Sequence, residues 1–286
     1  MTTPATQSTE DYIRELEETA DGRVVVERPQ PEVAIVRLAD PDNQNALGGP
    51  LTVELRRKLA ALTAEPQVRA IVLTGTGRFF SVGGDWKLMT ERAHTYTERP
   101  EGTTGLWYWI RNEFGGIARL ITQTDKVVIA ALNGDAAGVA LAWALNCDLI
   151  AAAEDARLVT AFGRIGLVPE VGTNWVLTRR VGYARAFELF LSGRPLSGRE
   201  AADTGLVNVA LPREELMSHV EGWTRRVCAL APHVVRMTKP LMRAAADMSW
   251  HHAILAEEFA EPSTFTTRAH QEAVRALVTG ATKALG

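Results

Sequence analysis

Residues 131–148 read ALNGDAAGVALAWALNCD, and the local pattern in and around them decides the fold prediction. The run KVVIAAL, residues 126–132, is apolar and rich in β-branched side chains, which is typical of a buried strand. The small and polar residues that follow predict a turn. From Gly138 to Leu145 the chain is again apolar, and this length favours a buried helix after the turn.

Strands and helices are expected to alternate on both sides of this stretch. Pro29 and Pro31 separate two β-branched runs, which predicts a pair of strands. Pro50 begins a segment with leucines at helical spacing, and proline is well tolerated in the first turn of a helix. The expected strands are 23–28, 33–38, 69–74, 126–132 and 148–152. The expected helices begin at Pro50 and at about residues 105, 138, 184, 197, 213 and 234. This alternation predicts an α/β fold.

No linker divides the chain into independent domains. From about Leu177 strands become rare and helices predominate. We therefore divide the chain into a polar N-terminal arm that could be loose (1–22), an α/β core (23–205) and a helical C-terminal region (206–286).

Composition and charge exclude several classes of protein. With 286 residues, 46% of them hydrophobic and 23% charged, the chain is an ordinary globular protein. A net charge of −3 gives no basic field for nucleic acid or an anionic membrane. Neither a signal peptide nor a transmembrane segment is expected. Cys147 and Cys228 lie in apolar stretches, as buried thiols of a reducing compartment do, so we expect a cytoplasmic protein. The six histidines show no metal-binding spacing, and we expect no metal.

Another glycine-rich turn, the first of the two along the chain, follows the strand at 69–74. It reads GTGRFFSVGGDWKLM, residues 75–89, and Gly83 and Gly84 permit close approach of the backbone to a ligand. The Val139 amide lies at the start of the apolar helix, where amides have no partner within the helix. Two such turns could polarise one carbonyl oxygen, and its enolate form would gain most.

The two turns belong to a longer set of motifs through which the chain resembles the crotonase, or enoyl-CoA hydratase/isomerase, family. The resemblance extends from about Val24 to the end. The motifs are Asn45-Ala46-Leu47, Phe80-Ser81-Val82-Gly83-Gly84-Asp85, Val128 to Gly134, Gly138, Cys147-Asp148, Phe162 to Pro169 and Gly193 to Gly205.

The resemblance implies an α/β crotonase-like spiral of ββα units, with a helical C-terminal region that trimerises. It implies an acyl-CoA thioester as substrate, with coenzyme A as part of that substrate and no separate cofactor. It also implies a homotrimer or a dimer of trimers, and an oxyanion hole formed by the amides of Gly84 and Val139. The residues that it places at the substrate are Ala46, Val82, Gly83, Asp85, Trp86, Gly138, Ala142, Phe162, Trp175 and Phe265.

The usual acid/base pair of the family is missing. Hydratases of the family carry two glutamates at positions that correspond to Ala142 and Phe162, and neither residue here transfers protons. Glu170 follows Pro169, where isomerases and aryl-CoA dehalogenases of the family carry an aspartate. The resemblance therefore implies that Glu170 is the catalytic base.

A single base favours double-bond isomerisation, because one carboxyl can remove a proton and return it elsewhere. A hydratase or hydrolase with non-standard acid/base residues remains an alternative, as does a non-catalytic acyl-CoA-binding subunit. Glu113 is a reserve second carboxylate. Asp135 either contacts the substrate or hydrogen-bonds its own backbone. The sequence does not determine the acyl group or choose between trimer and hexamer.

Overall fold

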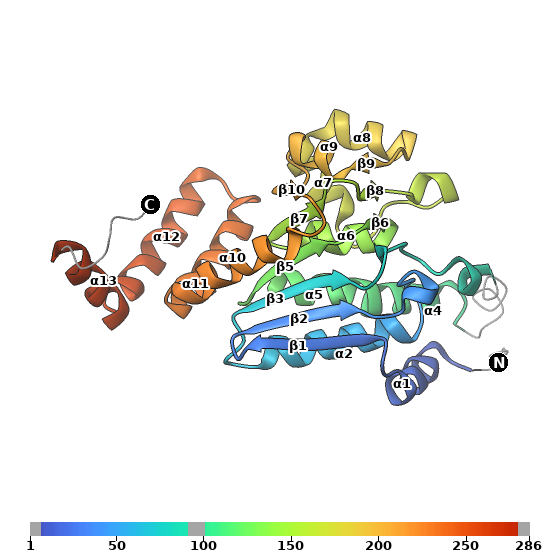
Figure 1. Cartoon of the computed structure of the whole chain (residues 1–286), viewed down its shortest axis with the longest axis horizontal. Helices are drawn as coiled ribbons and strands as arrows, with labels where there is room; N and C mark the ends of the chain where they lie inside the picture. The colour runs from blue at the N-terminus through green and yellow to red at the C-terminus, as the bar shows by residue number, and fades with distance from the viewer. Residues whose placement is uncertain (1–6, 91–100, 280–286) are drawn as a thin grey trace.

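The computed structural model describes residues 7–90 and 101–279, and its centre is a six-stranded sheet (Figure 1). The strand order is β1-β2-β3-β5-β7-β10. β1 and β2 are antiparallel, and each later strand pairs in parallel with its neighbour. The strands are β1 (Val24–Gln30), β2 (Val33–Leu38), β3 (Ala70–Gly75), β5 (Val127–Leu132), β7 (Leu149–Ala153) and β10 (Val209–Leu211). The predicted alternation and the α/β class are therefore confirmed.

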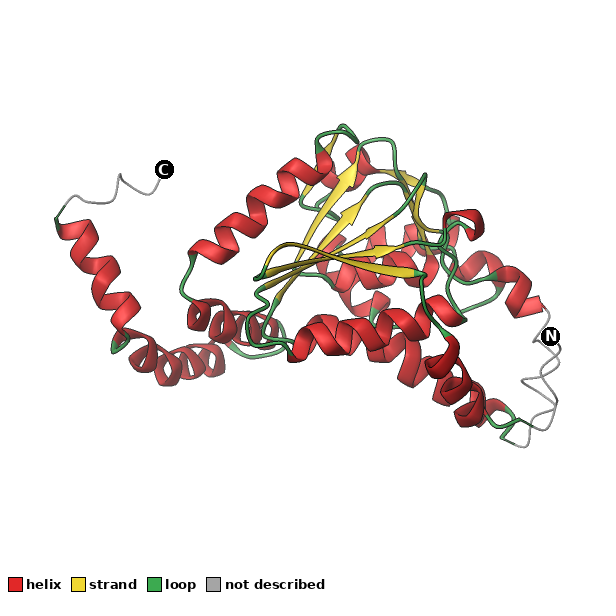
Figure 2. Cartoon of the chain, turned by 60° about the horizontal axis from the view of Figure 1, so that its bottom comes forward, coloured by secondary structure: helices red, strands yellow, loops and turns green. Residues whose placement is uncertain are grey.

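Helices cover both faces of this sheet (Figure 2). Successive side chains of a strand point to opposite faces. Accordingly, Ile71 and Val128 join a large core with α2 (Pro50–Ala64), α5 (Gly115–Gln123) and α6 (Gly138–Asn146). Their neighbours Val72 and Ile129 pack instead against α10 (Leu216–Ala229). The helix expected at about 105–122 is three segments: α4 (Thr103–Trp109), a π-helical turn η2 (Ile110–Phe114) and α5.

A second sheet of short strands has the order β4-β6-β8-β9. Its strands are β4 (Phe79–Ser81), β6 (Asp135–Ala137), β8 (Arg157–Val159) and β9 (Leu196–Ser197). Turns were expected over β4 and β6, and no strand was expected over β8 or β9, because runs of two or three residues are too short to show a period. This sheet matters for function, since both glycine-rich turns run through it.

The first described helix is packed rather than loose, which corrects the expectation of a loose N-terminal arm. In α1 (Thr9–Thr19), Tyr12, Ile13 and Leu16 are buried in a cluster with Val53 and Trp109. The polarity of this segment reflects its outer face only. At the other end, β10 extends the sheet past residue 205, where the core had been expected to end.

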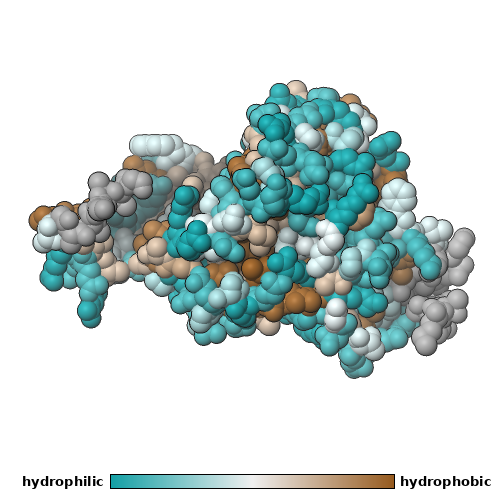
Figure 3. All heavy atoms as spheres, in the orientation of Figure 1, coloured by the Kyte–Doolittle hydropathy of each residue, from teal (hydrophilic) through white to brown (hydrophobic). Residues whose placement is uncertain are grey.

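The remaining segments complete the helical layers. They are η1 (Pro41–Asn43), η3 (Phe162–Ile165), α7 (Thr173–Val181), α8 (Tyr183–Ser192), α9 (Gly198–Asp203), α11 (Pro232–Ala245), α12 (Trp250–Phe265) and α13 (Arg268–Val278). α12 and α13 project from the core (Figure 1) and bury no residue. The face seen in Figure 3 is mostly hydrophilic, with apolar side chains near its centre. Within residues 7–90 and 101–279, no helix is both long and apolar enough to cross a membrane.

Candidate active site

The first glycine-rich turn is held as a short parallel bridge between Leu47 and Gly84. The Leu47 amide donates to the Gly83 carbonyl at 2.8 Å, and the Asp85 amide donates to the Leu47 carbonyl at 2.7 Å. In such a bridge the intervening Gly84 amide points to the other side. Among the described residues it has no hydrogen-bond partner. Within residues 7–90 and 101–279, no acceptor therefore occupies the Gly84 N–H group.

Asn45 fixes this turn, a role that the sequence analysis did not assign. Its side chain is fully buried. Its Nδ2 donates to the carbonyls of Thr76, Phe79 and Phe80 at 3.1–3.2 Å, and its Oδ1 accepts from the Asp40 amide. Because a buried amide with unmet bonds is costly, these four bonds define the loop closely. The motif Asn45-Ala46-Leu47 was noticed, but the partners are too distant in sequence to predict.

The second glycine-rich turn ends at the N-terminus of α6. Gly138 is the first residue of this helix and Val139 the second, and no side chain caps it. The first amides of a helix have no partner within it and carry partial positive charge. The Val139 amide is one of these donors, as predicted.

The two turns lie side by side because β4 and β6 are parallel neighbours. Ser81 of β4 pairs with Ala136 of β6. Gly84 and Val139 each follow their paired residue by three positions, so both donors lie beyond the same edge of the sheet. Close backbone contact supports this placement: a Cβ on Gly83 would lie 2.4 Å from the Ala137 carbonyl oxygen. Glycine at 83, with a φ of 84°, is therefore required.

Glu170 lies in the turn that leads into α7. Its main-chain oxygen accepts from the Thr173 amide at 3.0 Å and from Thr173 Oγ1 at 2.6 Å. Its carboxylate has neither a hydrogen bond nor an ion pair with another described residue. Burial raises its pKa from the ordinary value of 4.5 to about 7, because a low dielectric penalises the charged form. The start of α7 nearby would favour the charged form, but desolvation dominates the shift.

The turn after Glu170 contacts the helix that carries Val139. Asn146, at the end of α6, donates from Nδ2 to the Val171 carbonyl at 2.9 Å. Val139, Ala142 and Asn146 are spaced by three and four residues, so they share one face of α6. The Glu170 turn therefore borders the helix face that begins at the proposed oxyanion donor.

The two positions to which the family resemblance assigns glutamates are apolar and buried. Ala142 in α6 is 1% exposed and Phe162 in η3 is 3% exposed. The structure therefore offers no side chain at either position that could transfer a proton.

The other residues predicted at the substrate lie in varied settings. Near the first turn, Ala46 is buried, Val82 is half-buried and Trp86 is exposed. Asp85 is occupied: one oxygen accepts from the Leu88 amide at 3.0 Å and the other from Asn43 Nδ2 at 3.1 Å. This bonding gives Asp85 a structural task at the start of the following helical turn.

Two aromatic candidates are accessible and belong to helices α7 and α12. The guanidinium carbon of Arg179 lies over the ring of Trp175 in α7, 4.0 Å from the ring centroid. Phe265 ends the projecting helix α12 and is 59% exposed.

Asp135 does not hydrogen-bond its own backbone, which corrects one of its two expected roles. It is tied to Arg157 of β8, whose amide, Nε and Nη2 donate to it at 2.7–2.9 Å. Its side chain thus joins two strands of the small sheet.

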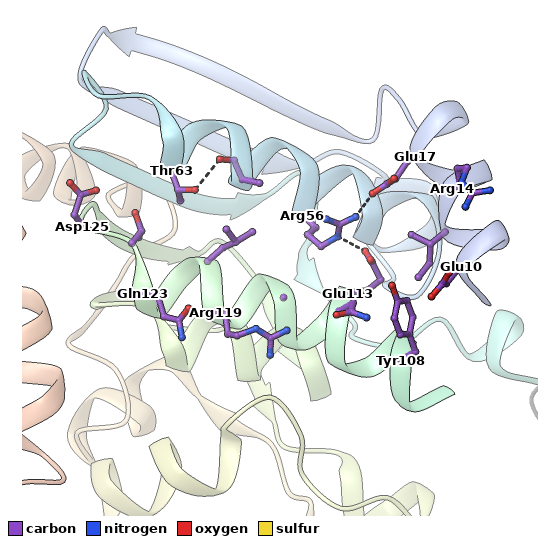
Figure 4. Close-up of a pocket in the computed structure, with 16 residues that line it drawn as sticks. Glu10, Arg14, Glu17, Arg56, Thr63, Tyr108, Glu113, Arg119, Gln123 and Asp125 are labelled. Atoms are coloured by element: carbon purple, nitrogen blue, oxygen red, sulfur yellow. Dashed lines mark hydrogen bonds and ion pairs between the residues drawn. The ribbon is translucent and has the colours of Figure 1, made fainter. Parts of the chain in front are cut away.

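Glu113 lines a cavity of about 970 Å³ between α1, α2 and the α4–α5 segment (Figure 4). It is 1% exposed and accepts from Arg56 Nε at 2.9 Å, and Arg56 also pairs with Glu17. Burial raises the Glu113 pKa, while Arg56 opposes the shift. Glu170, Gly84 and Val139 are not among the residues that line this cavity. Glu113 is thus a partner in an ion-pair chain and does not face Glu170.

Metal chemistry has no evident ligand set in the described part of the chain. No three side chains of histidine, cysteine, aspartate or glutamate gather there as metal ligands would.

Comparison with known proteins gives one consistent result. Residues 28–280 match the sequence model of the family described as "Enoyl-CoA hydratase/isomerase". A Mycobacterium tuberculosis protein named "Probable enoyl-CoA hydratase EchA12" is 33% identical over 227 residues, covering 78% of each protein.

Solved structures agree with this match. An enoyl-CoA hydratase from Polaromonas sp. JS666 superposes with a TM-score of 0.80 at 26% identity, covering 91% of this chain and 98% of that one. A monofunctional enoyl-CoA isomerase from Mycobacterium smegmatis superposes with a TM-score of 0.67 at 28% identity, covering 81% and 98%.

Proposed function

Because the chain belongs to the enoyl-CoA hydratase/isomerase family, we propose that it moves the double bond of an enoyl-CoA thioester, with Glu170 as its single acid/base residue. The Glu170 carboxylate removes a proton from the carbon next to the thioester carbonyl. The electron pair spreads over a dienolate. The same carboxyl then returns the proton two carbons further along, so the double bond has moved and no atom is lost.

The amides of Gly84 and Val139 stabilise the dienolate oxygen in this proposal. Both belong to turns that the β4–β6 pairing brings together, and neither has a partner among the described residues. Loss of one such donor typically raises a barrier by about 2.7–4 kcal/mol. As these donors are main-chain groups, a valine at position 139 serves as well as a glycine.

The observation that carries the proposal is the state of the Glu170 carboxylate. It has no partner among the described residues, and burial raises its pKa to about 7. A general base works best when its pKa lies near the working pH, because it is then both available and strong. With alanine at 142 and phenylalanine at 162, Glu170 is the carboxyl that the family resemblance leaves for this chemistry.

The missing glutamates also motivate two other functions. A hydratase or hydrolase would need groups other than those at 142 and 162 to activate water. A non-catalytic acyl-CoA-binding subunit would need only the two amides and the substrate pocket. Both alternatives predict outcomes that differ from isomerisation in the experiment below.

We further propose that α11, α12 and α13 form contacts between copies of the chain in a homotrimer or a dimer of trimers. Large apolar side chains on these helices are exposed, including Met242, Trp250 and Phe259, the last at 84%. A stable monomer rarely leaves so many accessible. Sedimentation of the purified protein would show a trimer or hexamer if this is correct, and a monomer if it is not.

One experiment separates the reactions. The protein is incubated with trans-2-, trans-3- and cis-3-enoyl-CoA in deuterated water, and the products are followed by mass spectrometry. Isomerisation predicts interconversion of the 3-enoyl and 2-enoyl thioesters without gain of water, and deuterium enters the product to the extent that the Glu170 carboxyl exchanges its proton with solvent before returning it. Addition of the elements of deuterated water, about 20 mass units, would indicate hydration, and release of free coenzyme A would indicate hydrolysis. Binding without any conversion across the panel would favour the non-catalytic subunit.

A further inference from the structure

Asn146 joins α6 to the turn that carries Glu170. Its Nδ2 donates to the Ala142 carbonyl at 2.8 Å, one turn back in the same helix, and to the Val171 carbonyl at 2.9 Å. Only 6% of the residue is exposed. A buried amide donor with both hydrogens used is a rigid connection, because breaking either bond leaves a buried polar group unpaired.

The backbone at the other end of this connection adopts an unfavourable conformation. Val171 has a φ of 48°, in the left-handed region. For a β-branched residue this region is a genuine outlier, and it persists only where the surroundings enforce it. Val171 also packs against the main core, so its side chain does not turn freely.

Two hydrogen-bonded carbonyls hold the turn in this conformation. The Glu170 carbonyl is bound by Thr173, from the start of α7. The Val171 carbonyl is bound by Asn146, from the end of α6. The backbone on which the Glu170 side chain is mounted is thus fixed between two helices. The carboxylate itself has no such support among the described residues, so its direction depends on the backbone.

The Asn146 bond also sets the distance between the base and an oxyanion donor. Val139 and Asn146 are seven residues apart in one helix, or about 10.5 Å at 1.5 Å per residue. This spacing does not vary, since α6 is continuous and buried. The Asn146 hydrogen bond therefore attaches the Glu170 turn to α6, the same helix that presents the Val139 amide.

We propose that Asn146 is a positioning residue, which holds the strained Glu170–Val171 turn against α6 and so keeps the Glu170 carboxylate at the carbon it deprotonates. This inference rests on the proposed function, because it takes Glu170 as the base. Asn146 itself touches no reacting atom. A displacement of about 1 Å at a reacting group can lower a rate on the order of a hundredfold.

Asn146→Leu tests the proposal, because leucine has a similar size and no donor. We expect kcat on a 3-enoyl-CoA to fall by about 10- to 100-fold with KM within about twofold of wild type. The pH midpoint of kcat should also move, since the released carboxylate is more accessible to water. Asn146→Asp is a second variant of the same shape, whose oxygen repels the Val171 carbonyl, and it should lose kcat at pH 8 in the same way.

Asn208→Leu is a control for losing an asparagine side chain that is hydrogen-bonded to the main chain, at an exposed position. Asn208 also makes a 2.8 Å bond to the main chain, from the Ile150 amide, but it lies outside the α6–Glu170 connection. It should lose some stability and keep the wild-type kcat and pH midpoint. Wild-type kcat in both Asn146 variants would overturn the proposal. So would a loss of kcat with an unchanged pH midpoint.

Failure of this inference is distinguishable from failure of the proposed function. If Glu170→Gln is inactive while both Asn146 variants turn over normally, Glu170 is the base and Asn146 does not position it. If Glu170→Gln itself turns over at the wild-type rate, the proposed function fails, whatever Asn146 does.

Discussion

The backbone of Gly83 lies against that of Ala137 so closely that a Cβ on Gly83 would be 2.4 Å from the Ala137 carbonyl oxygen. No Cβ in a folded protein tolerates this distance to a backbone atom. The contact joins the segment that presents the Gly84 amide to the segment that presents the Val139 amide. The proposed oxyanion hole therefore depends on contact between two backbone segments. This contact is possible because Gly83 has no side chain.

Gly83→Ala should separate the two turns. We expect kcat/KM to fall by at least about 100-fold, as for the loss of one oxyanion donor. The matched control is Gly22→Ala: Gly22 has nearly the same φ, 81° against 84°, but nothing lies within 4 Å of its Cβ position. Both variants carry the left-handed strain, and the clash is specific to Gly83. Equal activity of the two variants would show that the contact between the turns is unimportant.

The pH dependence of turnover should report Glu170. Burial raises the pKa of this carboxyl to about 7, and a base acts only when it is deprotonated. Turnover should therefore rise with pH through a midpoint near 7, and at pH 5 it should be about 100-fold below the plateau. Steady-state kcat between pH 5 and 9 measures this. A flat profile above pH 5 would mean that a carboxyl of ordinary pKa, or none, controls the step.

The same shift predicts that the protein is destabilised by its own base. Between pH 4.5 and about 7, Glu170 holds a proton in the folded state that it has lost in the unfolded chain. The free energy of unfolding therefore falls as the pH rises through this range. Above pH 7 the cost is on the order of 3 kcal/mol. Glu170→Gln, which cannot ionise, should unfold at higher denaturant than wild type at pH 8 and at nearly the same denaturant at pH 4.5. The reverse order at pH 8 would indicate that the carboxylate is well solvated or paired.

The buried pair Arg56–Glu113 should serve stability and not chemistry. Arg56→Met leaves Glu113 unpaired and 1% exposed, which should cost about 3–5 kcal/mol. Adding Glu113→Gln should recover much of this loss, because the uncompensated charge is then gone. Chemical denaturation measures both variants, and kcat per folded molecule should stay near wild type. A selective loss of kcat in the Glu113→Gln single variant would restore Glu113 as a second catalytic carboxylate.

Much of the fold was predictable because it rests on local patterns. The β-branched runs became β1, β2, β3 and β5, and the segment after Pro50 became α2. The strand, turn and buried helix expected around residues 131–148 are β5, the turn with β6, and α6. Burial makes these patterns regular, since an apolar face must repeat with the period of its element.

The details of the candidate site were less accessible because they depend on contacts between distant residues. Glycine at 83 was read as freedom to approach a ligand, whereas the structure shows that it approaches Ala137. The left-handed Val171 breaks a local preference, and no pattern around a valine predicts that. Asn146 follows the apolar residues of a predicted helix. Its hydrogen bond to Val171 joins residues 25 positions apart, so no local pattern predicts it. The sequence of α1 is polar overall, but its inner face packs against Val53 and Trp109.

The measurement that bears most directly on the central claim is deuterium exchange and double-bond migration in Glu170→Gln. Wild type and variant are incubated with cis-3-enoyl-CoA in deuterated water, with acyl-CoA binding followed in parallel by calorimetry. We predict that the variant binds with an affinity close to that of wild type and that both exchange and migration fall by about 100- to 10,000-fold, as expected when a general base is lost. Exchange and migration at the wild-type rate in Glu170→Gln would contradict the assignment of Glu170 as the base.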